Sequence, residues 1–128
     1  MIKEIDDSLY STVSGWWKAR DFVPPQREIL PRGYVAFVDE VPIFAGFLYK
    51  DDRACLGLFI FLTSNPEASI EARKKAFSEL EQHVEAVSKS LGIKALITGT
   101  NNQNLCDRFL ENGFKKYDEN AVHLMKGI

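Results

Sequence analysis

Two short polar stretches in this 128-residue chain hold residue types that could bind or transform a ligand. The first is Arg73-Lys74-Lys75, a tight basic cluster near the start of a long amphipathic segment. The second is the Gly-Thr-Asn-Asn elbow at 99–102, directly after a short apolar run. Cations at a helix start suit phosphate groups, because the helix dipole and free N–H groups there also attract anions. An elbow behind a buried strand is a place where α/β proteins hold ligands.

Both stretches also have purely structural interpretations, and the residues alone leave these open. A basic residue at position 73 or 74 falls in the apolar stripe of the helix and could simply reach solvent past the helix end. The two asparagines of the elbow could serve only as a turn and a helix cap. Catalytic residues stay unassigned, since the sequence does not rank the potential general bases, which are Glu40, Asp51, Asp52 and His123.

The composition is that of an ordinary globular protein, with 45% hydrophobic residues and a formal net charge of −2. The length favours one domain over residues 1–128.

No apolar run approaches the roughly 20 residues that span a bilayer, and no signal peptide is visible, so we expect a cytoplasmic protein. The acidic balance argues against general nucleic-acid binding. Cys55 and Cys106 lack metal-ligand spacing, so we expect no metal site and two reduced, mostly buried thiols.

The hydrophobic periodicity alternates between strand and helix patterns. Apolar residues spaced by threes and fours predict a long helix up to Leu91, capped by Asn65 or Ser69. Residues 39–42 separate two aromatic and β-branched runs as a hairpin turn, though not of the tightest kind. In chain order we expect a strand at 1–5, a helix to about Arg20, an irregular segment or short helix at 22–32, strands at 34–38, 43–49 and 55–63, the long helix, a strand at 95–98, a helix ending at Gly113, and a hairpin at 115–117 and 122–125.

This order predicts an α/β (α+β) sandwich with a mostly antiparallel central sheet of roughly six or seven strands, flanked by about three or four helices. The order and the C-terminal motif resemble the GNAT superfamily of N-acetyltransferases, which use acetyl-CoA. Residues 102–114, NQNLCDRFLENGF, are similar to the family pattern Asn-x-x-Ala-x-x-Leu-Tyr-Glu-Lys-x-Gly-Phe. Because the element order also fits, the resemblance covers nearly the whole chain. A second family motif, Gln/Arg-x-x-Gly-x-Gly/Ala, is present at 73–78 only as Arg-x-x-Ala-x-Ser, without either glycine.

The resemblance implies acetyl-CoA as the cofactor and assigns residues to it. It implies that the end of the fourth strand binds the pantetheine arm and the acetyl carbonyl through its backbone, that the start of the long helix binds the pyrophosphate, and that an asparagine of the elbow contacts the pantetheine. The tyrosine that protonates the leaving thiolate in many members is replaced here by a phenylalanine, which cannot donate a proton. The implied coenzyme-binding residues are Phe61, Leu62, Thr63, Ser64, Arg73, Lys74, Lys75, Ala76, Phe77, Ser78, Asn101, Asn102 and Phe109.

Three functions remain open at this point. The first is transfer of an acetyl group to an unidentified amine of a small molecule or a protein, by direct attack. The second is a catalytically degenerate GNAT-like binding or structural module, favoured by the missing glycines and tyrosine; small proteins of this kind look like those carried by phages. The third, acyl transfer to a nucleic-acid base, is disfavoured by the acidic balance.

A homodimer is common among similar folds. A tryptophan at 16 or 17, beside Lys18 and Arg20, either packs on the sheet or lines an acceptor groove or a protein interface.

Overall fold

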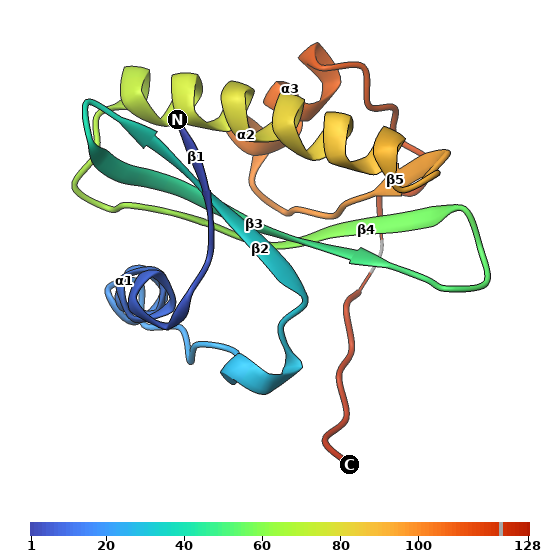
Figure 1. Ribbon diagram of the computed structural model, residues 1–128, viewed down its shortest axis with the longest axis horizontal. Coiled ribbons are helices and arrows are strands. Elements are labelled where there is room, and N and C mark those ends of the chain that lie inside the picture. The colour runs from blue at the N-terminus through green and yellow to red at the C-terminus, as the bar shows by residue number, and fades with distance from the viewer. Residues whose placement is uncertain (121) are drawn as a thin grey trace.

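The computed structural model describes residues 1–120 and 122–128 and contains one sheet in the order β1-β2-β3-β4-β5 (Figure 1). The first three strand pairs are antiparallel, and β4 and β5 are parallel. The strands are β1 (Ile2–Glu4), β2 (Arg32–Val38), β3 (Val41–Lys50), β4 (Leu56–Ser64) and β5 (Ala95–Ile97). The helices are α1 (Asp7–Lys18), α2 (Ile70–Ser90) and α3 (Gln103–Glu111), with a 3-10 turn η1 (Arg27–Ile29).

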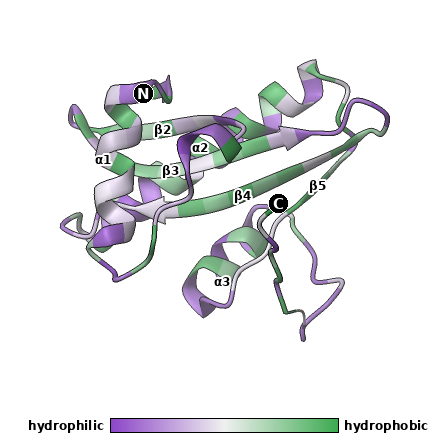
Figure 2. Ribbon diagram, turned by 90° about the horizontal axis from the view of Figure 1, so that it is seen from below, coloured by the Kyte–Doolittle hydropathy of each residue, from purple (hydrophilic) through white to green (hydrophobic). Residues whose placement is uncertain are grey.

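The sheet is covered by helices on both faces, with α2 and α3 on one side and α1 on the other (Figure 1). Alternation along β3 sends Phe44 and Leu48 toward α2, and Ala45 and Phe47 toward α1. Two separate hydrophobic clusters result, because successive strand residues point to opposite faces. Hydrophobic residues accordingly run along much of β4 in Figure 2. The predicted α/β sandwich is therefore confirmed.

The helix ends follow local side-chain chemistry. Of the two predicted caps for α2, Ser69 is the actual one, since its Oγ accepts from the Ala72 N–H at 3.1 Å. Asn65 instead accepts from the Glu67 N–H at 3.0 Å and donates to the Pro42 carbonyl at 3.1 Å. This second role ties the end of β4 to the start of β3.

The turn between β2 and β3 is tighter than predicted. Val38 pairs directly with Val41, so the turn has only two central residues, Asp39 and Glu40. Their φ angles are +50° and +65°. Left-handed geometry at both positions matches the right-handed twist of the strands, and aspartate tolerates it better than most residues. The expectation of a looser turn was therefore wrong.

The predicted C-terminal hairpin is also absent from the described residues, which contain five strands rather than six or seven. Residues 115–117 and 122–125 carry no strand pairing, and Tyr117, Val122 and Leu124 are exposed. An alternating apolar pattern identifies a segment that could pair, but it does not supply a partner strand.

The expectation that Cys55 is buried in a strand was also wrong, because this residue lies in the turn before β4 and its side chain is exposed. No helix within the described ranges is long and apolar enough to cross a membrane.

Glu81 provides a test of the packing between α2 and the sheet. Its side chain is only 4% exposed, and burial, followed by the charge of Glu85, raises its pKa above the ordinary value. The folded state therefore binds more protons than the unfolded state, so stability falls as the pH rises from the unfolded value of 4.5 to the raised folded value. We expect Glu81→Gln to stabilise the protein by roughly 1 kcal/mol at neutral pH.

Thermal melts over a pH series measure this effect. The gain from Glu81→Gln should vanish well below pH 4.5, where the carboxyl is protonated in both states. Glu28→Gln, at an exposed glutamate, is the control and should show no such dependence. Destabilisation by Glu81→Gln at neutral pH would contradict the prediction.

Candidate functional site

The candidate site begins where β4 and β5 part. Only three residue pairs join these strands, Leu56 with Ala95, Gly57 with Leu96 and Leu58 with Ile97. β4 then continues to Ser64, while β5 ends and the chain turns into the elbow at 99–102. In the described chain no strand accompanies β4 on that side beyond Leu58. Its outward backbone groups there are free to bind something other than a strand.

A β-bulge lies within this unpaired part of β4. Ala45 pairs with Thr63 and Phe47 with Ile60, so Phe61 and Leu62 together oppose the single residue Gly46. Phe61 has a φ of +55°, an uncommon conformation for a bulky residue. Bulges of this kind turn backbone groups away from the regular ladder direction.

Gly46 makes room for the bulge. A Cβ atom at this position would collide with the Phe59 ring and lie 3.1 Å from Leu62 Cδ2. A larger residue opposite the bulge would therefore push these side chains aside.

A cleft of about 1270 Å³ opens beside the bulged part of β4, and we call it the main cleft. It is bounded by the end of β4, the chain after α1, the first turns of α2, and the elbow with α3. Of the predicted site residues, Phe61, Leu62, Thr63, Ser64, Arg73, Asn101 and Asn102 line it. Trp16 and Trp17 are both buried in the cluster beneath the sheet, and Trp17 also lines this cleft. The other lining residues are Arg20, 22–26, Ile29, Phe44, Thr100, Asn104, Leu105, Arg108 and 125–128.

A smaller cavity of about 790 Å³, the side hollow, lies between α2 and α3. Arg73, Asn104 and Arg108 line both spaces, so they stand where the two meet. The other lining residues of the side hollow are Ile70, Lys74, Phe77, Ser78, Asp107, Glu111 and Asn112.

Arg20, Arg73 and Arg108 form an arginine cluster in the main cleft. Arg73 donates from Nε to the Asn65 carbonyl at 3.3 Å and from Nη2 to the Pro66 carbonyl at 2.8 Å. Burial, and next the charge of Arg73, lower the pKa values of both Arg20 and Arg108. No member of the cluster forms an ion pair within the described chain. The charge of Glu111 raises the pKa of Arg108 and so offsets part of that lowering. Three cations without an ion pair among the described residues nevertheless gather in the main cleft, which suits it to anions.

The sequence matches no family model and no curated protein, so similarity is found only among solved structures. A probable acetyltransferase aligns with a TM-score of 0.72 at 12% identity, over 100% of this chain and 99% of that one. The protein has the fold of the GNAT acetyltransferases. The ribosomal-protein-S18-alanine N-acetyltransferase from Escherichia coli aligns with a TM-score of 0.72 at 10% identity, over 92% and 79% of the two chains. The aminoglycoside N-acetyltransferase AAC(6')-Iy in complex with CoA gives 0.65 at 11%, over 99% and 100%.

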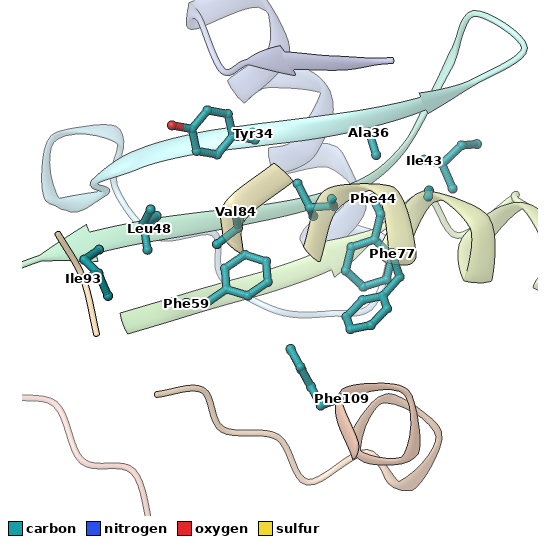
Figure 3. Packing of buried hydrophobic residues seen from close by; sticks show 12 residues of the cluster. Tyr34, Ala36, Ile43, Phe44, Leu48, Phe59, Phe77, Val84, Ile93 and Phe109 are labelled. Carbon is teal, nitrogen blue, oxygen red and sulfur yellow. The ribbon is translucent and has the colours of Figure 1, made fainter. Parts of the chain in front are cut away.

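Phe109 takes part in the core of this GNAT fold and does not line the main cleft. It is 3% exposed, and its ring lies 4.9 Å from that of Phe77, 4.8 Å from that of Phe114 and 6.2 Å from that of Phe59. Figure 3 shows it pointing from α3 toward Phe59 and Phe77. Edge-to-face rings at these distances add stability beyond the area that they bury. The aromatic position of the C-terminal motif therefore anchors α3 to the sheet and to α2.

The remaining predicted residues divide between the core and the surface. Ala76 is fully buried, Phe77 is buried and forms one wall of the side hollow, and Lys75 is exposed and lines neither space. Lys74 and Ser78 line only the side hollow.

The potential general bases lie outside the main cleft. Glu40 is in the β2–β3 turn, Asp51 and Asp52 follow β3, and the His123 ring packs against Gly99. No carboxylate or imidazole side chain from the described residues lines this cleft.

Arg20 and Arg108 are the two arginines of the main cleft that the sequence analysis did not assign to the coenzyme. Arg108 lies inside the C-terminal motif, at a position where the family pattern has leucine. Arg20 meets Ser64, which is 44 positions further along the chain, so no local spacing signals the contact.

The position of Phe109 leads to a stability prediction. We expect Phe109→Ala to destabilise the protein by about 3–5 kcal/mol, because it leaves a cavity among three aromatic rings. Leu110→Ala, at an exposed leucine of the same helix, should cost less than about 1 kcal/mol. Urea unfolding of both variants measures the difference. Equal losses would show that α3 is not held by this aromatic cluster.

Proposed function

We propose that the protein is an N-acetyltransferase that takes its acetyl group from acetyl-CoA and transfers it to an amine. The observation that carries the proposal is the end of β4, bulged and without a strand partner, beside an arginine cluster that forms no ion pair among the described residues. This arrangement offers backbone donors for an amide-containing arm and a thioester carbonyl, and cations for a pyrophosphate. It occurs in a fold whose solved relatives include acetyltransferases, one of them in complex with CoA.

The residues of the main cleft and side hollow fit the chemistry of such a coenzyme. Backbone groups of Phe61, Leu62 and Thr63 would hold the pantetheine arm and the acetyl carbonyl, with Asn101 and Asn102 nearby. The Ser64 carbonyl is omitted because it already accepts from Arg20. Arg73, Lys74 and Arg108 would face the phosphates near the start of α2, with Ser78 beside them. The proposal omits Lys75, which lines neither space, and Ala76, Phe77 and Phe109, which are buried in the core.

The transfer needs little acid–base chemistry from side chains. The acceptor nitrogen attacks the thioester carbonyl, a C–N bond forms, the C–S bond breaks, and the proton lost by the amine balances the one taken up by the leaving thiolate. Because no carboxylate or imidazole side chain from the described residues lines the main cleft, water would carry these protons. Backbone N–H groups at the bulge would stabilise the negative charge on the carbonyl oxygen.

Calorimetry with acetyl-CoA tests the coenzyme site. We expect micromolar binding by the parent protein and at least about tenfold weaker binding by Arg73→Gln/Arg108→Gln, a loss of about 1.4 kcal/mol. The matched control is Lys75→Gln, which removes a cation from the same turn of α2 without touching either space. Equal weakening by the control would mean that only general charge matters, and no binding at millimolar coenzyme would overturn the proposal.

The alternative, a degenerate binding or structural module, gives a different result. Such a module would bind acetyl-CoA weakly or not at all, or would bind it without acetylating any amine. Thiol release from acetyl-CoA in the presence of an amine panel therefore separates the two functions.

A further inference from the structure

The part of the main cleft away from the side hollow is lined by a different set of residues. It is lined by the end of α1, by the chain between α1 and β2, and by Ser64, none of which borders the side hollow. If acetyl-CoA occupies the bulged strand and the side hollow, this part is left for the acceptor. The inference below therefore rests on the proposed function.

Arg20 is held firmly in this part of the cleft. Its Nη1 donates to the Ser64 carbonyl at 2.6 Å and to the Trp16 carbonyl at 3.2 Å, and its Nη2 donates to the Ser64 Oγ at 3.1 Å. These three bonds fix the guanidinium on the end of β4, so little side-chain entropy is left to lose when a ligand binds.

The same bonds leave one edge of the guanidinium available. Of its five N–H groups, the Nε–H and one Nη2–H have no acceptor among the described residues. These two donors lie side by side on one edge of the planar group, and together they match the two oxygens of a carboxylate. Arg20 thus lines the main cleft with two preoriented N–H donors, which we call its fork.

The surrounding charges favour the same class of ligand. No aspartate or glutamate from the described chain lines the main cleft, whereas Arg20, Arg73, Arg108 and Lys126 all do. Burial, and then the charge of Arg73, lower the pKa of Arg20, so a nearby anion would relieve repulsion. The charged side chains that a polycationic acceptor would meet here all carry like charge, which is costly in a partly buried site.

Apolar side chains form the rest of this region. Trp17, Phe22, Val23 and Ile29 all line it, and Phe22 and Val23 are 63% and 92% exposed. Exposed apolar groups that gather at the rim of a cleft mark a surface for an apolar part of a ligand.

We infer that the acceptor is a small amine that also carries a carboxylate and an apolar body, and that the free edge of Arg20 binds this carboxylate. Apolar amino acids belong to this chemical class. Arg20 is then the residue that selects the acceptor, while Arg73 and Arg108 serve the coenzyme.

Pairs of amines that differ only in the carboxylate test this inference. The probes are L-phenylalanine with 2-phenylethylamine, and L-leucine with 3-methylbutylamine; neamine serves as a polycation. Thiol release from acetyl-CoA gives kcat/KM for each amine. We expect a carboxylate-bearing member to exceed its partner by at least about tenfold, as suits a charge-assisted bidentate pair, and neamine to be the poorest acceptor.

Variants of Arg20 assign the selectivity to this side chain. Arg20→Gln should abolish the preference for the carboxylate, and Arg20→Lys should restore only part of it, because an ammonium group keeps the charge but lacks the fork. Arg53→Gln, at an exposed arginine outside the cleft, should leave the preference intact. Acetyl-CoA calorimetry and melting temperatures confirm that each variant still folds and binds the coenzyme.

The outcomes distinguish the inferred acceptor class, the coenzyme site and the role of Arg20. Equal rates within the pairs, preference for neamine, or acetyl-CoA binding without acetylation of any carboxylate-bearing probe would overturn the inference while leaving the coenzyme site standing. Failure to bind acetyl-CoA would instead overturn the proposed function. A preference that persists in a folded Arg20→Gln protein would show that another residue selects the acceptor.

Discussion

The site depends on the early end of β5. β4 has nine residues and β5 only three, so most of one edge of β4 is left without a strand partner. Backbone N–H and C=O groups need hydrogen-bond partners, and in this fold neither strand nor helix supplies them along that edge. Phe109 packs α3 onto Phe59 and Phe77, and the neighbouring Leu105 and Arg108 of the same helix line the main cleft. The bulge and the three arginines therefore surround an edge that water or a ligand must satisfy.

Local chemistry explains why much of the fold could be predicted from the sequence. The Ser69 and Asn102 caps, the left-handed Gly113 and the apolar run of β4 are signals carried by adjacent residues. The C-terminal strands could not be predicted in the same way, since strand formation depends on a partner that the segment itself does not encode. The tight β2–β3 turn was missed because Asp39-Glu40 lacks the Asn or Gly that usually announces two positive φ angles.

The candidate site was predictable only in part, for a related reason. Arg73 drew attention because a cation interrupted an apolar helical stripe, which is a local anomaly. Arg20 is brought to the cleft by the packing of α1 beneath the sheet, and its contact with Ser64 spans 44 positions. Phe109 occupies a motif position, yet its ring is buried. A motif specifies where a residue stands in the chain, while packing decides whether its side chain reaches a cleft.

The short connection from β4 to α2 links the fold to the charge of the site. The Ser64 carbonyl accepts from Arg20, and the Asn65 and Pro66 carbonyls accept from Arg73. Three successive carbonyls thus hold two guanidinium groups that would otherwise repel each other. Burial first, and then repulsion from Arg73, lower the pKa of Arg20, and an anion that enters the cleft relieves this repulsion. Because backbone carbonyls already orient both arginine side chains, these side chains lose little conformational entropy when they bind an anion.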